Sequence, residues 1–445
     1  MAEIAPLTAL RYDLARLKGG LGSVVAPPYD VISPDERTVL AARDPHNVVR
    51  LILPEGEGDA RYANAGDLFA RWRKEGALVR DEEPGFYRYD QTFLPPGSTG
   101  VPPIRRRGFL ALVRVVPFAD RVVLPHERTL SGPKEDRLKL FRATRANLSP
   151  GFMLYRDAKG ELNAPLDAAE PLAEFSTADG VTHLLSKVSS RDAIRAIVAG
   201  VARSTLLIAD GHHRYETALR YSKEVADAAG TAGANDRGEY RYFMTFLANG
   251  DDPKLVVFPT HRHVHSLPSF SFDDLVARAR SVFAVEELTR DASVGDILER
   301  LRIAGHKAPS IAAASGDGRV VLLTLRGDAD LDSHPTLSKK PAVLRRTDVT
   351  ILHAGILEGL LGITPEAQAA KTNLWYPQDA TRSMGELRGG RGQALFLLNA
   401  TPVAQVREVA EAGEVMPQKS TFFYPKVATG LAIHTLEAAR SVASV

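Results

Sequence analysis

The residues of this sequence with the clearest chemical potential lie in the stretch ADGHHRYETAL, residues 209–219. His212 and His213 are adjacent there, and Arg214 follows them directly. A histidine pair that binds zinc from a helix needs a spacing of four residues, and neighbouring side chains point in different directions. Metal binding by both histidines is therefore disfavoured. A second alternative, in which the histidines only complete a turn, stays open.

The same stretch suits phosphate binding. The apolar run STLLIA, residues 204–209, predicts a buried strand, and Gly211 provides the backbone freedom for a tight turn. The residues that follow predict a helix, whose first N–H groups and positive dipole end attract anions. Arg214 adds a two-pronged donor for phosphate oxygens, and the two histidines add further donors. Asp210 fits an anion site only if it binds a metal ion or a proton, which favours a complex of phosphate with a cation.

Polar residues in two other segments are candidates for catalysis. Asp30 follows the two prolines of PPYDV, and we interpret it as a metal ligand or as a base for a hydroxyl group, with a plain turn aspartate as the alternative. The segment HERT lies in a predicted loop, where functional residues concentrate. His126 and Glu127 are its catalytic candidates, and Thr129 is a candidate to contact the substrate or cap the site. Glu127 is the preferred general base, because a carboxylate can accept the proton of a substrate hydroxyl group. Lys134 and Arg137, on the predicted helix that follows, are candidate phosphate ligands or part of a solvated helix face.

Two later segments also carry polar side chains. His261, His263 and His265 alternate in PTHRHVH, and side chains two residues apart share one face of a strand. A three-histidine zinc site is an alternative there, but it lacks an evident carboxylate to orient the histidines, so we disfavour it. The polar and aromatic segment MPQKSTFFYPK, residues 416–426, caps the site in our interpretation, and a packed surface loop is the alternative. His353 lies in an amphipathic helical pattern and is expected to be a hydrogen-bonded core residue.

Composition narrows the functional classes. The chain has 445 residues, 44% hydrophobic and 25% charged, as expected for a globular protein of two or three domains. It has no cysteine, which excludes disulfides, thiolate metal sites and cysteine nucleophiles. A net charge of +2 without a long basic run gives nucleic-acid binding no support. The N-terminus lacks the pattern of a signal peptide and no apolar run approaches about 20 residues, so we expect a cytoplasmic protein without membrane contact.

The elements that must position these residues alternate between strands and helices. Ser33 followed by Pro34 predicts the start of a helix. Hydrophobic patterns predict a β-hairpin formed by residues 86–93 and 108–116. They also predict three further helices: residues 186–201, residues 347–362 and a last helix after residue 431. We therefore expect an α+β (mixed α/β) protein. Its expected domains are residues 1–267, which bind phosphate or a nucleotide, and residues 268–445, whose loop 416–426 contributes to the site.

Five blocks of this sequence resemble one known family. They are VVAPPYDVIS, HERT with Lys134 and Arg137, ADGHHRYETAL, PTHR and MPQKSTFFYPK. Together they look like the domain-of-unknown-function family 1015, and the block around Gly211 resembles the signature of the ParB and sulfiredoxin superfamily. The resemblance implies a ParB/sulfiredoxin-like N-terminal core that binds nucleotide phosphates at this turn. Sulfiredoxin activity is excluded, because it needs a cysteine where this chain has His212.

The superfamily also contains kinases that phosphorylate free serine, and resemblance to this branch implies the function. We expect a nucleotide-dependent phosphotransferase that acts on a small hydroxyl metabolite, with ATP or ADP and Mg²⁺ as cofactors and with Asp210 and Asp30 as ligands of the ion. The resemblance adds further residues to the site: His261, Arg262, Lys419 and Ser420. Arg262 would bind phosphate or carboxylate, and the others would contact the substrate or cap the site. A nucleotide-binding regulatory protein without transfer chemistry is the alternative, and a homo-oligomer is compatible with either function.

Overall fold

The computed structural model describes residues 1–95, 101–129, 131–230, 236–290 and 292–443. The chain forms two compact units: unit 1 contains residues 1–125, 129–256 and 425–445, and unit 2 contains residues 126–128 and 257–424. Each unit has its own β-sheet and helices, so the expected mixed α/β class is confirmed. The chain enters unit 2 briefly at residues 126–128 and again after residue 256, near the expected boundary after residue 267, and its residues 425–445 return to unit 1.

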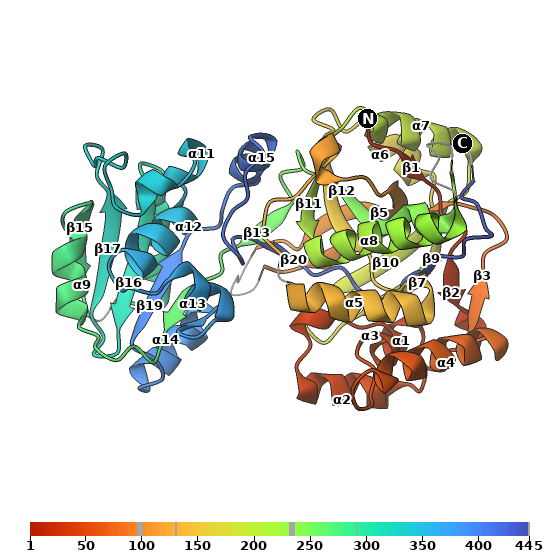
Figure 1. Ribbon diagram of the computed structural model, residues 1–445, viewed down its shortest axis with the longest axis horizontal. Coiled ribbons are helices and arrows are strands. Elements are labelled where there is room, and N and C mark those ends of the chain that lie inside the picture. The colour runs from red at the N-terminus through yellow and green to blue at the C-terminus, as the bar shows by residue number, and fades with distance from the viewer. Residues whose placement is uncertain (96–100, 130, 231–235, 291, 444–445) are drawn as a thin grey trace. The chain divides into compact units, whose positions relative to one another are not determined.

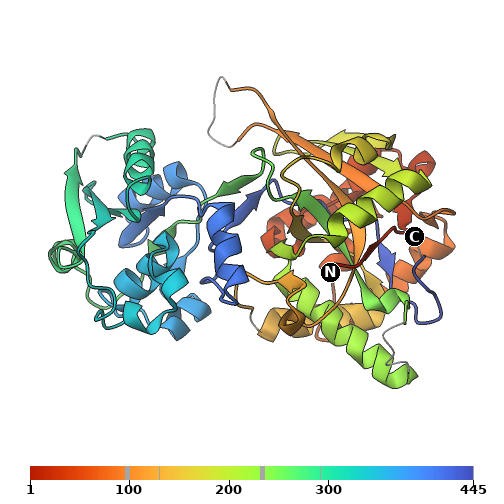
Figure 2. The ribbon, with the colours of Figure 1, turned by 90° about the horizontal axis from the view of Figure 1, so that it is seen from above.

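A mixed nine-stranded sheet lies in the described part of unit 1 (Figure 1). Eight of its strands follow in spatial order: β6 (Val123–Leu124), β11 (Leu206–Asp210), β8 (Gly151–Tyr155), β12 (Tyr242–Asn249), β5 (Ile104–Arg114), β4 (Phe86–Phe93), β10 (Thr182–Val188) and β9 (Glu170–Ser176). The ninth, β1 (Ile4–Ala5), also pairs with β5. β11 runs parallel to β6 and β12 parallel to β8, whereas the other neighbours are antiparallel. The predicted hairpin is formed by β4 and β5, which lie side by side in Figure 2.

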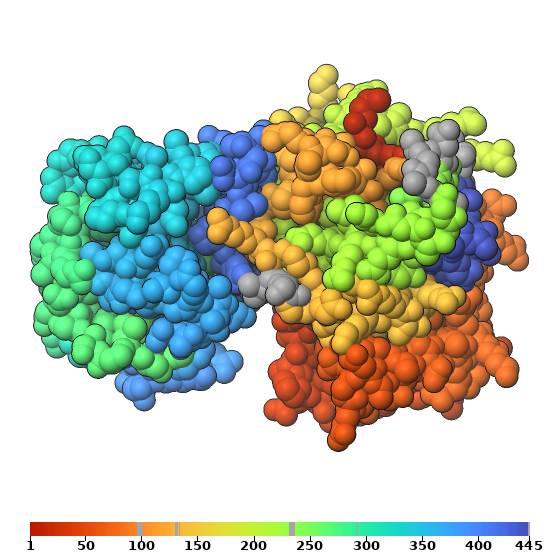
Figure 3. Space-filling model, in the orientation of Figure 1, coloured from red at the N-terminus to blue at the C-terminus, as the bar shows by residue number. Residues whose placement is uncertain are grey.

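Unit 1 also contains eight α-helices in its described residues. They are α1 (Leu21–Val24), α2 (Pro34–Arg43), α3 (Val49–Ile52), α4 (Ala60–Lys74), α5 (Ser131–Thr144), α6 (Asn163–Asp167), α7 (Arg191–Ala202) and α8 (His212–Ala229). α5 packs against α8, and the two helices form much of the face of unit 1 seen in Figure 3. Tyr215 and Ala218 of α8 and Ile194 and Ile197 of α7 are buried in one apolar cluster with the sheet. Both helices thus bury an apolar face against the sheet.

Local capping signals explain where several helices begin. The Ser33 hydroxyl accepts the N–H of Glu36, and Pro34 is the first residue of α2, as predicted. The predicted helix over residues 186–201 is wrong at its start, because Ser186–Val188 complete strand β10. Ser190 then caps α7 by accepting the N–H of Ala193, so the serine marks the true boundary.

Unit 2 contains an antiparallel six-stranded sheet. Its strands follow in spatial order: β15 (Phe283–Leu288), β17 (Val320–Leu325), β16 (Ser310–Ser315), β19 (Ala394–Leu398), β14 (Arg262–Val264) and β18 (Leu374–Trp375). The α-helices are α9 (Phe272–Ala279), α10 (Val294–Gly305), α11 (Ala342–Arg345), α12 (Asp348–Thr350), α13 (Pro365–Ala370), α14 (Ala380–Arg388) and α15 (Val403–Glu411). Shorter strands are β2 (Leu10–Tyr12), β3 (Leu78–Arg80) and β7 (Ala146–Asn147) in unit 1, and β13 (Val256–Phe258) paired with β20 (Phe422–Tyr424).

Two helix predictions differ from the structure. Residues 347–362 do not form one α-helix, because α12 passes into a π-helix, Ile351–Glu358, whose residues 351–357 are buried. Apolar periodicity reports burial but does not distinguish a π-helix from an α-helix. The predicted last helix is also wrong: β21 (His434–Thr435) pairs with β7, and the described residues after 431 contain no helix. In the described parts of the chain, no helix is long and apolar enough to cross a membrane.

Two buried histidines predict acid sensitivity. Burial lowers the pKa of His183 in unit 1 and of His261 in unit 2 to about 4, from 6.5. Because the folded pKa is the lower one, the unfolded chain binds more protons between pH 6.5 and 4, and the stability held above pH 6.5 is lost as the pH falls through this window. We expect the free energy of unfolding to fall by up to about 3 kcal/mol per histidine, measured by urea unfolding at several pH values.

A matched pair of variants tests this expectation. The His183 ring is stacked between Tyr89 and Phe175 and hydrogen-bonded to the Tyr89 hydroxyl at 2.5 Å, so His183→Gln should reduce the pH dependence. The exposed His306 serves as the control, and His306→Gln should leave the dependence as in the wild type. An unchanged pH profile in His183→Gln would contradict the assignment.

Candidate functional site

The predicted strand, turn and helix around Gly211 are confirmed in unit 1. β11 ends at Asp210, Gly211 has φ = +90°, and α8 begins at His212. A side chain at Gly211 would be strained at this φ, and its Cβ would lie 3.0 Å from Nε of Arg214. The N–H of Gly211 donates to Oδ1 of Asp210 at 2.9 Å. The glycine therefore lets the chain turn sharply from the sheet into the helix, whose N-terminal end is an anion-binding position.

Charged side chains surround this helix end. Oδ2 of Asp210 lies 3.4 Å from Nη2 of Arg214 and 3.2 Å from Nζ of Lys426. Arg214 is 5% exposed and also donates from Nη1 to the carbonyl oxygen of Pro150. Two cations thus pair with one carboxylate at the helix N-terminus. Lys426 was not among the predicted site residues, although it belongs to the MPQKSTFFYPK segment that carried the prediction.

A second cation that the sequence analysis did not select is Arg106. Its side chain is 2% exposed and donates to Oε1 of Gln91 and, at 2.6 Å, to the carbonyl oxygen of Pro425. Its Nε and Nη1 have no hydrogen-bond partner in the described residues, and its guanidinium carbon lies 4.9 Å from the ring centre of Phe152. Burial lowers the pKa of Arg106 to about 10. In the sequence this residue is the middle of a short arginine run, and nothing in that run indicates which arginine is buried.

The strand register places Arg106 and Asp210 on the same face of the sheet. Gln91 lies opposite Arg106, and Phe152 lies opposite both Phe246 and Asp210. Phe246 lies opposite Leu110, which shares a face with Arg106 because residues four apart on a strand point the same way. The two Phe rings therefore lie between the buried arginine and the carboxylate at the turn.

Two other predicted residues of unit 1 lie close to this helix end. Asp30 is exposed in the short 3₁₀-helix Tyr29–Val31, and the Arg137 guanidinium stacks on the Tyr29 ring at 4.1 Å. Burial raises the pKa of Tyr29, and the negative charge of Asp30 adds to this increase. The positive charges of Arg137 and Arg214 act in the opposite direction. Arg137 is buried and also donates to the carbonyl oxygen of Ile52 at 2.7 Å.

Lys134 and Thr129 form a separate network with α8. Nζ of Lys134 lies 2.7 Å from Oε2 of Glu216, and the Thr129 hydroxyl donates to Oε1 of the same carboxylate at 2.7 Å. Lys134 also donates to the Thr129 hydroxyl at 3.1 Å. Of the two predicted histidines on α8, His212 is buried and His213 is partly exposed. The predicted phosphate ligands of unit 1 thus gather around the first turns of α8.

The remaining predicted residues meet in unit 2, around residues 418–421, which we call the QKST loop. The Glu127 carboxylate accepts backbone N–H groups from three consecutive residues of this loop: Lys419 (3.4 Å), Ser420 (3.0 Å) and Thr421 (3.4 Å). The completely buried His126 ring lies 2.9 Å from the Thr421 hydroxyl through Nε2. HERT and MPQKST, nearly 300 residues apart, are therefore joined by side chain to backbone hydrogen bonds.

Arg262 holds the same loop from its carbonyl side. It is completely buried and donates from Nη2 to the carbonyl oxygens of Gln418 (3.2 Å) and Lys419 (3.1 Å). Its Nε donates to Nε2 of His353 at 3.0 Å, and burial lowers the pKa of Arg262 to about 10. Lys419 has φ = +56°, a strained conformation for a residue with a side chain, which these contacts hold in place. The arrangement of Arg262 supports the loop, and its predicted phosphate contact stays a prediction.

Several histidines of unit 2 are neutral core residues. His353 is buried, with Nδ1 2.7 Å from Oε1 of Gln368 and Nε2 accepting from Arg262, so its predicted structural role is confirmed. Burial, together with the charge of Arg262, lowers the pKa of His353. Nδ1 of His261 accepts the N–H of Leu398 at 3.2 Å. No three or more metal-ligating side chains converge anywhere in the described residues, so the alternative three-histidine zinc site is not formed there.

The QKST loop borders a cavity of about 280 Å³ within unit 2. Gln418 and Pro417 line it beside the π-helix residue His353 and the ring of Tyr376. Arg128, next to Glu127, also lines it. Ser420 itself is buried and donates its hydroxyl to the carbonyl oxygen of Pro417, so its side chain stabilises the loop. Sequence blocks that resemble one family thus form two clusters, one in each unit.

Comparisons with known proteins add the following findings. The model of a family described as "Protein of unknown function (DUF1015)" matches residues 4–350. No curated protein matches the chain. One similar solved structure is a conserved hypothetical protein from Pyrococcus furiosus, with 14% identity over 70% of this chain and 93% of that chain and a TM-score of 0.33. A free serine kinase in complex with AMP has 13% identity over 70% of this chain and 89% of that chain, with a TM-score of 0.35. SbnI with a C-terminal truncation from Staphylococcus aureus has 11% identity over 73% of this chain and 87% of that chain, with a TM-score of 0.36. These TM-scores are too low to establish a shared fold.

Proposed function

This chain belongs to the DUF1015 family of proteins of unknown function, and from that premise we propose that it is a nucleotide-dependent phosphotransferase acting on a small hydroxyl metabolite. The nucleotide binds through its phosphates at the N-terminal end of α8. Free serine is the first acceptor to test, because the block around Gly211 resembles the signature shared with kinases of free serine. Either ATP or ADP is the phosphoryl donor.

The observation that carries the proposal is the gathering of cationic side chains at the Gly211 turn. Arg214 and Lys426 both pair with the Asp210 carboxylate, and the helix end adds its own partial positive charge. Arg106 adds a buried guanidinium on the same face of the sheet. A phosphate group would give these donors an acceptor with several oxygens, and charge-assisted hydrogen bonds to phosphate are the strong ones.

Magnesium belongs to this proposal as the partner of the phosphates. The Asp210 carboxylate lies at the turn and Asp30 lies in the neighbouring 3₁₀-helix, and carboxylate oxygens are the ligands that Mg²⁺ combines with phosphates in nucleotide sites. The ion would neutralise charge on the transferred phosphoryl group. Lys426 would then move from Asp210 to a phosphate oxygen.

The two candidate bases differ in their surroundings. The Glu127 oxygens are taken by three N–H groups of the QKST loop, whereas Asp30 is exposed. We therefore assign acceptance of the hydroxyl proton to Asp30 and support of the loop to Glu127. His212 and His213 serve as donors to the phosphates, and Lys134 and Arg137 complete the positive surroundings.

The first test is a thermal-shift screen with ATP and ADP, with and without Mg²⁺, followed by ³¹P NMR with serine and other alcohols as acceptors. A magnesium-dependent rise in Tm and formation of a phosphomonoester are expected. Binding without transfer to any acceptor would favour the alternative, a nucleotide-binding regulatory protein. No rise with any nucleotide would exclude both functions.

Asp30→Asn is expected to lower kcat by about 100-fold or more, because the amide cannot accept the hydroxyl proton. A nucleotide-dependent rise in Tm should still be measurable, since Arg214, Lys426 and Asp210 remain to hold the phosphates and the ion at α8. As a control, Asp35→Asn changes an exposed carboxylate in the first turn of α2 and should keep wild-type turnover. Wild-type turnover in Asp30→Asn would overturn its assignment as the base.

A further inference from the structure

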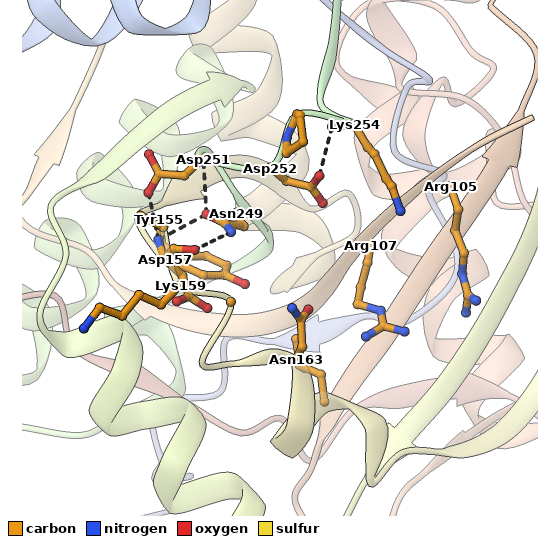
Figure 4. A pocket seen from close by; sticks show the side chains of 14 residues that line it. Arg105, Arg107, Tyr155, Asp157, Lys159, Asn163, Asn249, Asp251, Asp252 and Lys254 are labelled. Carbon is orange, nitrogen blue, oxygen red and sulfur yellow. Dashed lines mark hydrogen bonds between the residues drawn. The ribbon is translucent and has the colours of Figure 1, made fainter.

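Unit 1 contains a cavity of about 500 Å³ that is not part of the proposed nucleotide site. It lies beside the first residues of β5 and the last residues of β8 and β12, and residues 157–160 and α6 complete its wall (Figure 4). Arg105 and Arg107 line it, whereas Arg106 between them does not. Because neighbouring residues on a strand point to opposite faces, this cavity and the buried Arg106 lie on opposite faces of the sheet.

The carboxylates of the cavity wall are engaged in holding its loops. Asp157 accepts the N–H groups of Glu161 and Leu162, both at 2.9 Å. Asp251 accepts the N–H of Asp157 at 3.0 Å and lies 3.4 Å from the Arg156 guanidinium. Asp252, which also lines the cavity, accepts the N–H of Lys254 at 2.9 Å. These contacts fix the loop geometry and occupy acceptor positions on all three carboxylates.

The cationic side of the wall is turned toward the cavity. Figure 4 shows the side chains of Arg105, Arg107 and Lys254 pointing into the same space, with the Asn163 amide facing them. Lys254 has no ion-pair partner in the described part of the chain, and it is exposed. Lys159 also lines the cavity but extends away from this group in Figure 4.

The two arginines have more donors than the neighbouring carboxylates can accept. Asp90 is 2% exposed and is shared by three guanidinium groups: Arg88 (2.8 Å), Arg105 (2.7 Å) and Arg107 (3.4 Å). Asp167, which is 57% exposed, lies 3.0 Å from Arg107. Each guanidinium has five N–H groups, so this sharing leaves donors for a further acceptor. On this side of the cavity, the four cations Arg88, Arg105, Arg107 and Lys254 face the three carboxylates of Asp90, Asp167 and Asp252.

We propose that this cavity binds the phosphate group of a small phosphorylated metabolite. Donors reach the same space from β5, from the segment after β12 and from α6, and a tetrahedral group with several oxygens can accept from all of them. A planar carboxylate is already satisfied by one arginine, so it would leave the other donors without an acceptor. Tyr155 and Leu166 provide apolar wall for the organic part of the ligand. This site is independent of the proposed phosphoryl transfer.

The test is isothermal titration calorimetry of the full chain with inorganic phosphate, at constant ionic strength, and with citrate in parallel. Lys254→Met should weaken phosphate binding about tenfold, because it removes one charge-assisted donor and no ion pair. Lys159→Met, a matched change of a lysine on the other side of the cavity, should leave the affinity unchanged. Equal losses in the two variants would show a general effect of surface charge and would overturn the proposal.

The Arg214→Ala variant separates this cavity from the α8 site, since phosphate could bind at either. Phosphate binding sensitive to Lys254→Met should persist in Arg214→Ala. Complete loss of phosphate binding in Arg214→Ala would place all of it at α8 and overturn the proposal. Tighter binding of citrate than of phosphate would also overturn it, in favour of a polycarboxylate.

Discussion

The Arg214→Ala variant is expected to bind nucleotide about 10- to 100-fold more weakly than the wild type and to lose measurable phosphoryl transfer. Arg214 lies at the first turn of α8 beside Gly211, and a hydrogen bond to a charged group contributes about 1.5–3 kcal/mol. The measurement is the nucleotide-dependent change in Tm with Mg²⁺, with affinities from calorimetry. Arg214→Lys keeps the charge but not the two-pronged donor, so an intermediate affinity is expected.

The difference between ligand-bound and ligand-free Tm is the informative quantity, because the substitution also costs stability. Arg214 is buried and bonded to the Pro150 carbonyl oxygen and to Asp210, and the groups left behind cost about 1–3 kcal/mol. Arg220 on the same helix is 55% exposed and pairs only with surface carboxylates, so Arg220→Ala is the matched control. Wild-type nucleotide affinity in Arg214→Ala would remove the phosphate site from α8.

Glu127→Gln is expected to destabilise unit 2 by about 1–3 kcal/mol. Both oxygens of the Glu127 carboxylate accept hydrogen bonds, and together they bind three backbone N–H groups. In a glutamine side chain the NH₂ group is a donor, so it would face N–H groups that are donors as well. If Glu127 were instead the general base, the same change would remove turnover and leave stability intact. The variant therefore decides between support of the QKST loop and proton transfer.

The two tryptophans allow each unit to be measured by itself. Trp72 lies in α4 of unit 1 and Trp375 lies in β18 of unit 2, so in a Trp72→Phe background the tryptophan fluorescence reports on unit 2. Urea unfolding of Glu127→Gln in this background should show the loss. Glu299→Gln, at an exposed ion pair on α10, should change the free energy of unfolding by less than about 1 kcal/mol. Equal stability of Glu127→Gln and the background protein would contradict the role in the loop.

Features that depend on neighbouring residues were predictable from the sequence. The strand before Gly211, the turn and α8 follow from an apolar run, a glycine and a helical pattern, all within 26 residues of chain, Ser204–Ala229. The cap at Ser33 and the hairpin of β4 and β5 are equally local. In each case, the backbone preference and the periodicity of side chains act over a few residues and do not depend on the rest of the fold.

Features that depend on distant residues were decided by the tertiary structure. The sequence identified Glu127, Arg262 and the QKST segment as candidates. Only the packing of distant segments places Glu127 to accept N–H groups of the QKST loop and Arg262 to donate to its carbonyl oxygens. Likewise, burial singled out Arg106 from a run of three arginines and brought Lys426 to Asp210. A side chain's charge and type are properties of the sequence. Its partners, exposure and pKa depend on which segments the fold brings beside it, and those contacts join residues hundreds of positions apart.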